Sequence, residues 1–416
     1  DITALAERLK GQEGVQKVTV AGSIRRRKET VGDADILAVA ENPEEIMKFF
    51  VSQPEVINVY AHGETRSSVK LNSGIDVDLR IVPKESYGAA MNYFTGSKAH
   101  NVALRSEAIR LGYKLNEYGL YKRGGKKSIA GETEEGLYKA LKMDYIPPEL
   151  RENRGEIEAA KSGKLPDLIP YGSLKGDLQI QTDWSDGSHS IEEMAREAFL
   201  LGLKYIAVTD HTKRLAMAHG LDEKRMRKQW EEIDKVNEKL KKEGVDMYVL
   251  KGSECDILED GTLDLPDNVL SELDVVGIAV HSHFHLPRRK QTERIIRAMR
   301  NPHADILFHP TGRVLKQREP YDVDMKQIIA EAKKTGTILE IDAYPDRLDL
   351  NDEYVRMCVD AGVKLAIDSD AHHKSHISYL DYGIGQARRG WATAEDVINT
   401  RSMEEILKLL KRNESR

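Results

Sequence analysis

"GDLQIQTDWSDG", residues 176–187, is the stretch on which our interpretation of the second half of the chain depends. It has the pattern of an apolar strand that ends in polar side chains, and Ser-Asp-Gly follows. A metal site on such a strand would ordinarily carry two histidines where this chain has Gln179 and Gln181. A neutral amide offers only its carbonyl oxygen and binds such metals more weakly than imidazole does. The stretch therefore indicates a metal site without its first two ligands.

The segments that follow alternate between apolar strands and amphipathic helices. Six further strand candidates run from "YIAVTD" (205–210) to "KLAIDSD" (364–370). Between the first two strands, Ser190 and Glu193 form a capping box in front of apolar residues at helical spacing. Alternating strands and helices predict a parallel sheet, and this many units favours a closed barrel.

Nearly every predicted strand in this half ends in a residue that can bind a metal. These residues are Gln179, Gln181, Asp210, His211, Glu254, His281, His309, Asp370 and His372. The carboxyl ends of parallel strands meet on one face of a barrel, which is the usual place for an active site. Histidine together with carboxylate suits Mn²⁺, Zn²⁺ or Fe²⁺. The pattern predicts a metal cluster on this face.

The first half carries a separate group of carboxylates. In "VAGSIRRRKETVGDADILAVA" (20–40), a turn at Gly22 and Ser23 precedes a strand that bears Asp33 and Asp35. Residues two apart on a strand share a face, and "GIDVDLRIV" (74–82) adds Asp76 and Asp78 in the same way. Converging carboxylates repel one another unless a divalent cation lies between them. The arrangement is typical of a two-metal site, and Ser23 and Arg26 could bind a triphosphate beside it.

Composition limits the classes of protein that need to be considered. The chain has 416 residues, of which 40% are hydrophobic and 32% charged, as in soluble proteins of two or three domains. It has no apolar run long enough to cross a membrane, and its two cysteines favour a reducing cytoplasm. A net charge of −6 argues weakly against a nucleic-acid binder, but basic residues cluster at 25–28, 122–127 and 288–290.

The motifs of the second half resemble those of the PHP family. They are "TDH" (209–211), "GSE" (252–254), "VHS" (280–282), "HP" (309–310) and "SDAH" (369–372). The resemblance implies a distorted seven-stranded β/α barrel that hydrolyses phosphoesters with up to three metals, here Mn²⁺ and/or Zn²⁺. The ligands that it implies are Asp186, His211, Glu254, His281, His309, Asp370 and His372. The chain departs from the family pattern at Gln179 and Gln181, so we expect at least one metal to be loosely bound or missing.

The first half resembles the palm and thumb of family X DNA polymerases, above all in "YFTGS" (93–97) and "LNEYGL" (115–120). The resemblance implies that Asp33, Asp35 and Asp78 are catalytic and bind Mg²⁺ or Mn²⁺. Asp76 falls where polymerase beta has a basic residue, and Arg80 falls on an arginine beside the metals. The positions that it implies for nucleotide binding are Gly22, Ser23, Arg26, Gly32, Tyr93, Phe94 and Asn101.

Together the two resemblances predict an α/β and α+β multidomain protein, with a mixed-sheet nucleotidyltransferase palm and a small α/β thumb before the barrel. The predicted segments are a palm (1–90), a thumb (91–145), a linker (146–174) and a PHP domain (175–416). A palm of this type follows a fingers region, so we expect the natural protein to be longer at its N-terminus.

The implied function is a DNA-directed DNA polymerase that fills short gaps in base-excision repair. The barrel would act as a Mn²⁺-dependent 3′-5′ exonuclease and abasic-site phosphoesterase, weakened by Gln179 and Gln181. The expected partners are gapped or primer-template DNA and a dNTP, with no membrane and a monomeric chain. Two alternatives stay open: a phosphatase of a small phosphomonoester with a vestigial nucleotide-binding half, and a DNA-binding scaffold with an inactive barrel.

Overall fold

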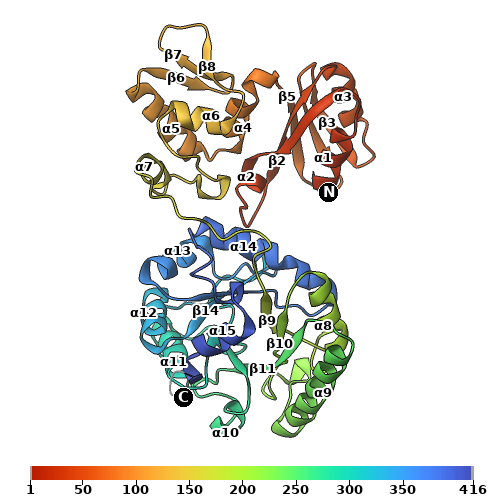
Figure 1. Cartoon of the computed structure of the whole chain (residues 1–416), viewed down its shortest axis with the longest axis vertical. Helices are drawn as coiled ribbons and strands as arrows, with labels where there is room; N and C mark the ends of the chain where they lie inside the picture. Colours follow the sequence, from red (N-terminus) through yellow and green to blue (C-terminus); the bar gives the residue numbers. More distant parts are fainter. Residues whose placement is uncertain (1, 414–416) are drawn as a thin grey trace. The chain divides into compact units, whose positions relative to one another are not determined.

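The computed structural model describes residues 2–413, which form two compact units, one up to Pro166 and one from Asp167 onward (Figure 1). Most of the predicted linker belongs to the first unit. It contains η2 (Pro148–Leu150) and α7 (Glu156–Lys161), and the Arg151 side chain between them is fully buried. The finer boundaries within each half stay predictions.

The first unit contains a five-stranded mixed sheet. Its strand order is β1-β2-β5-β4-β3, in which β2 and β5 are parallel and the other neighbours are antiparallel. The strands are β1 (Val15–Val20), β2 (Asp33–Ala40), β3 (Val56–His62), β4 (Arg66–Leu71) and β5 (Asp76–Ile81). Two helices, α1 (Ile2–Lys10) and α3 (Pro43–Val51), share a hydrophobic core with one face of this sheet.

Alternation along β2 separates this core from a polar face. Ala34, Ile36 and Ala38 lie in the core that α1 and α3 cover. Successive side chains of a strand point to opposite faces, so Asp33 and Asp35 lie on the other side of the sheet. The same rule holds on β5, where the odd-numbered residues from Val77 to Ile81 are in the core. Both strands therefore present their carboxylates on the face away from α1 and α3.

The rest of the first unit begins with α4 (Tyr87–Thr95), which packs on the polar face of the sheet. It is followed by α5 (Lys98–Arg110), by an antiparallel sheet of order β6-β7-β8, and by α6 (Glu134–Ala140). The strands of this sheet are β6 (Tyr113–Asn116), β7 (Gly119–Lys122) and β8 (Ser128–Ala130). Another short helix, α2 (Gly22–Arg25), follows β1.

A buried ionic group joins α2 to α6. Glu134 accepts hydrogen bonds from Arg25 (Nη2 to Oε2, 2.6 Å) and from Arg151 (Nη1 to Oε1, 2.6 Å). Burial by itself would raise the pKa of Glu134, but the guanidinium groups of Arg151 and Arg25 hold that pKa at about 2. This carboxylate is therefore charged at neutral pH and fixes the position of the loop that follows β1.

The second unit is a barrel of seven parallel strands in the order β15-β14-β13-β12-β11-β10-β9 (Figure 1). The strands are β9 (Gly176–Ile180), β10 (Tyr205–Val208), β11 (Tyr248–Asp256), β12 (Val275–Ala279), β13 (Ile306–Leu307), β14 (Ile338–Asp342) and β15 (Leu365–Asp368). The first and last strands meet, because Ile180 forms a parallel bridge with Ala371 and the Leu178 amide donates to Asp368 Oδ1 (2.8 Å). The predicted seven-stranded β/α barrel is confirmed.

Helices surround the barrel and bury its outer surface. They are α8 (Ile191–Leu200), α9 (Glu223–Lys242), α10 (Asp267–Leu270), α11 (Arg288–Met299), α12 (Met325–Thr335), α13 (Asp352–Ala361), α14 (Leu380–Arg389) and α15 (Met403–Leu409). Ser190 caps α8 with Glu193 in the predicted capping box. No helix within residues 2–413 is both long and apolar enough to span a membrane.

The inward side chains of the barrel change from apolar to polar along the strands. Near the strand starts, the inner layer consists of Leu178, Tyr205, Leu250, Val275, Ile306, Ile338 and Ala366. Every second residue of a strand points inward, so the next inner positions on three of these strands include Glu254, Glu340 and Asp368, all buried. The apolar layer is the floor of the barrel, and the polar layer lies at the carboxyl ends of the strands.

Candidate active sites

The first candidate site lies at the N-terminal ends of β2 and β5. Asp35 is opposite Asp78 in the strand register, and Asp33 is opposite Asp76. Asp78 accepts hydrogen bonds from Ser68 (2.5 Å) and from Arg80 (3.1 Å). Asp33, Asp35 and Asp78 thus come together on the polar face of the sheet, as predicted from their spacing.

Asp76 has different partners. Its Oδ1 accepts a hydrogen bond from Tyr60 (3.2 Å) and lies 3.4 Å from Lys70 Nζ. The Asp76 side chain is thus engaged with residues of the neighbouring strands β3 and β4.

The neighbouring carboxylates raise the proton affinity of Asp35. Burial, followed by the negative charges of Asp33 and Asp78, raises the pKa of Asp35 to about 6. A divalent cation among the three carboxylates would relieve this repulsion. The donors are oxygen atoms, which Mg²⁺ and Mn²⁺ prefer. The residues present therefore fit the predicted metals.

The turn after β1 brings Gly22 and Ser23 to these carboxylates. Gly22 has φ +64°, and a Cβ atom at this position would lie 2.9 Å from Asp35 Oδ2. Only glycine allows this close approach without strain. The Ser23 hydroxyl is buried and has no hydrogen-bond partner among the described residues. It is thus free to bind a ligand.

Two of the other predicted nucleotide contacts, Arg26 and Gly32, lie between β1 and β2. Arg26 is held inside the protein, because it pairs with Glu152 (3.1 Å) and donates to the Thr95 carbonyl oxygen. Gly32 lies in the turn before β2, with open space around its Cα. Their contact with a triphosphate stays a prediction.

Tyr93, Phe94 and Asn101 lie close together at the end of α4 and the start of α5. The rings of Tyr93 and Phe94 meet edge to face at 5.0 Å, and Arg80 lies over the Phe94 ring at 4.5 Å. Arg80 also contacts Asp78, so it links these aromatic rings to the carboxylates. Asn101 donates to the Tyr93 carbonyl oxygen (2.7 Å), while its own Oδ1 is buried without a partner among the described residues.

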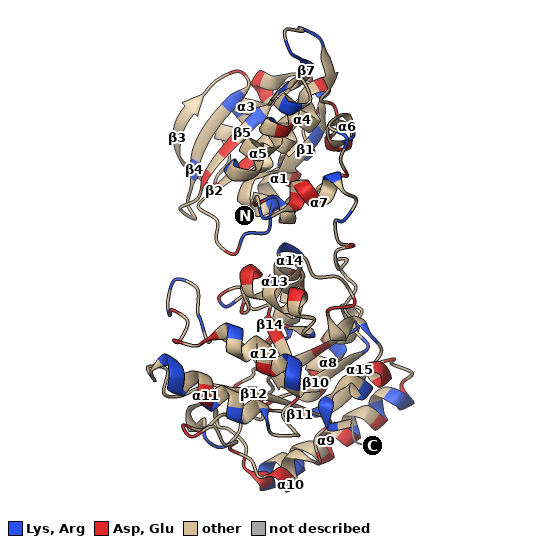
Figure 2. Cartoon of the chain, turned by 90° about the vertical axis from the view of Figure 1, so that its left-hand side faces the viewer, with Lys and Arg blue, Asp and Glu red and all other residues tan. Residues whose placement is uncertain are grey.

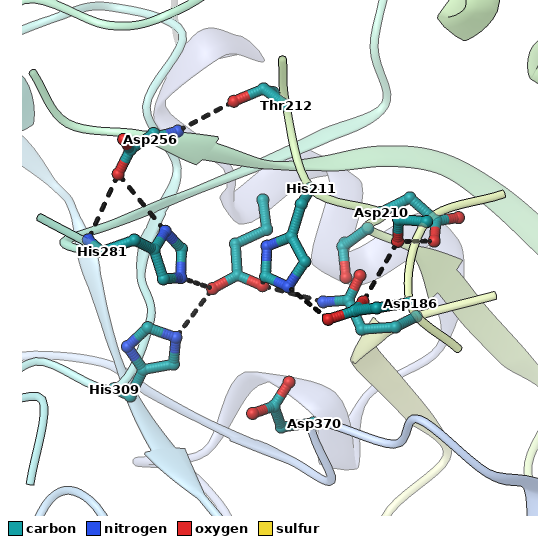
Figure 3. A network of polar contacts seen from close by, with 12 residues as sticks. Asp186, Asp210, His211, Thr212, Asp256, His281, His309 and Asp370 are labelled. Atoms are coloured by element: carbon teal, nitrogen blue, oxygen red, sulfur yellow. Dashed lines mark hydrogen bonds and ion pairs between the residues drawn. The ribbon is translucent and has the colours of Figure 1, made fainter. Parts of the chain in front are cut away.

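The second candidate site is centred on Glu254 at the carboxyl end of β11. Figure 3 shows His211, His281 and His309 gathered in this site. Glu254 Oε1 lies 3.0 Å from His281 Nε2 and 2.7 Å from His309 Nε2. Its Oε2 lies 3.3 Å from His211 Nδ1 and accepts a hydrogen bond from the Gln181 amide (2.8 Å). The structure thus gathers four predicted positions around one buried carboxylate.

Two groups of side chains in the barrel have the spacing of metal ligands. One group is Asp186, His211 and His372, and the other is His211, Glu254 and His281. His211 belongs to both, since its Nε2 faces Asp186 (3.6 Å) and its Nδ1 faces Glu254. The mixture of imidazole and carboxylate fits Mn²⁺ or Zn²⁺, as predicted.

Gln179 and Gln181 are fully buried in different settings. Gln181 uses its N–H group on Glu254, and its carbonyl oxygen has no partner among the described residues. Neither amide atom of Gln179 has one. A buried amide without partners is costly, so the Gln179 side chain has hydrogen-bonding capacity that a polar ligand could use.

Asp370 and His309 adopt unusual backbone conformations. Both have positive φ angles, +49° for Asp370 and +28° for His309, which are uncommon for residues other than glycine. By alternation His309 would point out of the barrel like Leu307, but its ring turns inward to Glu254. Asp370 lies 3.6 Å from the Arg347 guanidinium, and it is not in either ligand group. Its role as a metal ligand stays a prediction.

Comparisons with known proteins match parts of both units. The DNA polymerase beta thumb model matches residues 90–152, and the PHP domain model matches residues 177–403. The DNA polymerase/3′-5′ exonuclease PolX of Bacillus subtilis (strain 168) is 39% identical over 402 residues, which cover 96% of this chain and 69% of that protein. The chain belongs to the PolX family. It is an enzyme that joins a family X polymerase thumb to a PHP domain.

Proteins described as probable phosphatases match shorter parts of the chain. One from Thermoanaerobacter sp. (strain X514) is 30% identical over 237 residues, 54% of this chain and 89% of that protein. Another, from Caldanaerobacter subterraneus subsp. tengcongensis, is 28% identical over 270 residues, 58% of this chain and 96% of that protein. The chain is thus also similar to proteins that are described as probable phosphatases.

Charge within the barrel of this PolX-family chain is balanced by its own side chains. Burial lowers the pKa of His281, but the carboxylates of Glu254 and Asp256 outweigh burial and raise it to about 9. Burial likewise disfavours the charged form of His372, yet Asp370 and Asp186 raise its pKa to about 10.

Two functional contacts could not be predicted from the sequence motifs. Asp256 Oδ1 lies 3.3 Å from His281 Nδ1 and can orient that ring. The only hint in the sequence was that Asp256 follows Glu254 by two residues and therefore shares its side of the strand. Arg347 lies 3.4 Å from Asp342 and 3.6 Å from Asp370. It comes from the loop after β14, and no spacing rule predicts where a loop arginine will point.

Proposed function

We propose that the first unit is a DNA-directed DNA polymerase that fills short gaps during base-excision repair. Asp33, Asp35 and Asp78 would hold Mg²⁺ or Mn²⁺, which when bound supplies the positive charge that activates the primer 3′-hydroxyl and stabilises the leaving pyrophosphate. The observation that carries the proposal is the register of β2 and β5, which sets Asp35 opposite Asp78 on the face away from the core.

The surrounding residues have separate tasks in this proposal. The unpaired Ser23 hydroxyl would donate to the triphosphate, and the missing side chain of Gly22 leaves room for that group beside Asp35. Arg80 holds Asp78 in place through a 3.1 Å contact. The Tyr93 and Phe94 rings would flank the sugar, and the free carbonyl oxygen of Asn101 would accept from the base.

Primer extension with paired substitutions tests this proposal. Asp35→Asn keeps the size of the side chain and removes the charge that binds the metal. We expect it to lower nucleotide addition by at least about a hundredfold. Asp76→Asn is the matched control, because Asp76 lies on the same pair of strands but contacts Lys70 and Tyr60. Equal losses in both variants would refute the assignment.

We also propose that the barrel is a Mn²⁺- or Zn²⁺-dependent phosphodiesterase that trims DNA 3′ ends and cleaves at abasic sites, with activity weakened by Gln179 and Gln181. The ligand groups that meet at His211 support this. A bound metal would supply a Lewis acid for the phosphodiester. His281 and His309 fix the Glu254 carboxylate, and Asp256 fixes His281.

A phosphatase acting on small phosphomonoesters is the second candidate function of the barrel. The probable phosphatases that match about half of the chain favour it. The two candidates separate on paired chromogenic substrates in Mn²⁺. Hydrolysis of thymidine 5′-(p-nitrophenyl phosphate), a diester, favours the nuclease. Hydrolysis of p-nitrophenyl phosphate alone favours the phosphatase.

The remaining parts of the proposal concern partners and location. The chain would act as a monomer on gapped or primer-template DNA with a dNTP. Cys255 and Cys358 are buried and unpaired, which supports a reducing cytoplasm.

A further inference from the structure

A column of aromatic rings begins beside the barrel site. His373, His376, Tyr379 and Tyr382 recur every three residues, starting directly after the predicted ligand His372. Ring centroids are 5.6 Å apart for His373 and His376, 5.1 Å for His376 and Tyr379, and 6.1 Å for Tyr379 and Tyr382. The column therefore leads step by step away from the ligand groups.

The local backbone explains why the rings align. Residues Lys374–Tyr379 form the 3₁₀-helix η4, which continues into α14. A 3₁₀-helix has three residues per turn, so side chains at i and i+3 lie directly above one another. His376 and Tyr379 are accordingly stacked at an interplanar angle of 15°. Tyr344 meets both of these rings edge to face, at 5.2 and 5.4 Å, and braces the column from one side.

The outer end of the column is open to solvent. Tyr382 is 47% exposed, although large aromatic side chains are usually covered. It is not part of the hydrophobic clusters found among the described residues of the barrel, and its ring contacts Tyr379. Nearer the ligand groups, the ring nitrogens His189 Nδ1 and His376 Nδ1 are buried and have no hydrogen-bond partner among the described residues. Hydrogen-bonding capacity and stacking surface are thus both left unused along this path.

We propose that Tyr382, held in place by this column, is a base-stacking platform for single-stranded DNA whose 3′ end enters the barrel site. The inference rests on the proposed hydrolysis of DNA and specifies its substrate as a single-stranded 3′ end longer than a dinucleotide. Aromatic side chains stack on any base, so the platform would not depend on sequence. The three ring-to-ring steps from His373 to Tyr382 span 5.1 to 6.1 Å each. Stacked nucleotides rise about 3.4 Å each, so a base on Tyr382 would lie within about five nucleotides of the 3′ end.

Trimming kinetics with two substrate lengths test the platform. We expect Tyr382→Ala to raise KM for a ten-residue oligothymidylate by about fivefold or more, since removal of one stacking interaction costs at least that factor. The kcat value and the KM for the dinucleotide should not change. Tyr382→Trp should restore the parent KM. The matched control is Tyr248→Ala, because Tyr248 is similarly exposed (43%) but lies at the opposite end of the barrel, at the start of β11.

A binding measurement separates failure of the platform from failure of the proposed nuclease. The probe is an oligothymidylate with 2-aminopurine five nucleotides from its 3′ end, added in EDTA so that it is not cleaved. Stacking on Tyr382 should quench its fluorescence, and Tyr382→Ala should lose part of the quenching that Tyr248→Ala keeps. Equal quenching in both variants overturns the platform, as does an equal KM increase for both lengths. Absence of trimming in the parent chain would overturn only the nuclease.

Discussion

At the residue scale, the Gln181 side chain acts as a hydrogen-bond donor to Glu254, whereas a histidine at this position could instead bind a metal through its imidazole. Its amide donates to Glu254 and covers one oxygen of the carboxylate that a metal would bind. Gln181→His exchanges this donor for an imidazole. We expect the variant to retain more Mn²⁺ per chain after gel filtration, measured by plasma mass spectrometry, and to trim single-stranded DNA faster. Gln327→His, on the exposed surface of α12, is the control. An unchanged metal content would mean that Gln181 does not limit metal binding.

A second prediction at this scale concerns Glu134. Its pKa is about 2 in the folded protein, whereas the ordinary value for a glutamate side chain is 4.5. Because the folded-state pKa is lowered, the stabilisation is present above pH 4.5 and disappears as the pH falls from 4.5 toward 2. We expect Glu134→Gln to lower the unfolding free energy at pH 7 by about 3 kcal/mol, since it leaves the buried Arg151 and the half-buried Arg25 without their carboxylate partner.

The pH dependence supplies the check on this prediction. The difference in unfolding free energy between parent and variant, measured by urea denaturation, should shrink steadily below pH 4.5. A difference that is the same at about pH 7 and about pH 3 would show that Glu134 acts through packing and not through its charge.

Individual residues show which side-chain positions could be predicted from the sequence and which could not. Alternation on β2 and β5 sufficed to place Asp33, Asp35 and Asp78 on one face, because one side of each strand is buried. It could not place His309, whose positive φ reverses the direction that alternation predicts. Nor could it reveal that Arg26 is tied to Glu152, since they are 126 positions apart in the chain and come together only in the folded unit.

At the element scale, the loop between β7 and β8 offers an exposed basic surface (Figure 2). Lys122, Arg123, Lys126 and Lys127 are all exposed, and no acidic partner is found for them among residues 2–413. We expect Lys126→Gln with Lys127→Gln to weaken binding to gapped DNA. The slope of log affinity against log salt concentration should become shallower by about 0.9 for each phosphate that the variant no longer binds.

The control for the loop is a lysine that lies elsewhere on the surface. Lys242→Gln alters the exposed end of α9, where Lys242 pairs with Glu238 (3.7 Å). Its salt slope should equal that of the parent, as measured by fluorescence anisotropy. If the loop variant also keeps the parent slope, the loop does not contact DNA phosphates.

Elements differed in how well the sequence predicted them. The seven barrel strands were predicted from their short apolar runs, and α8 was predicted from its capping box and the helical spacing behind it. The linker was not recognised as a folded part of the first unit, because its stability comes from long-range contacts. Arg151 is buried against Glu134, and Glu156 binds His100 (2.7 Å). Neither contact leaves a local pattern in the sequence.

At the scale of the whole molecule, the chain contains two folded units, each with its own carboxylate site. We infer that these are two independent active sites, one for nucleotide addition and one for 3′ trimming. Each site has a residue that can be changed without altering the other unit. Asp35 belongs to the first site and Glu254 to the second.

The measurement that tests this claim most directly is a crossed assay on one labelled primer-template in Mn²⁺. Nucleotide addition and 3′ trimming are followed in the parent, in Asp35→Asn and in Glu254→Gln. We expect Asp35→Asn to lose addition and keep trimming, and Glu254→Gln to lose trimming and keep addition, with each loss at least about a hundredfold. If either substitution abolished both activities while the chain remained folded, the account of two independent sites would be contradicted.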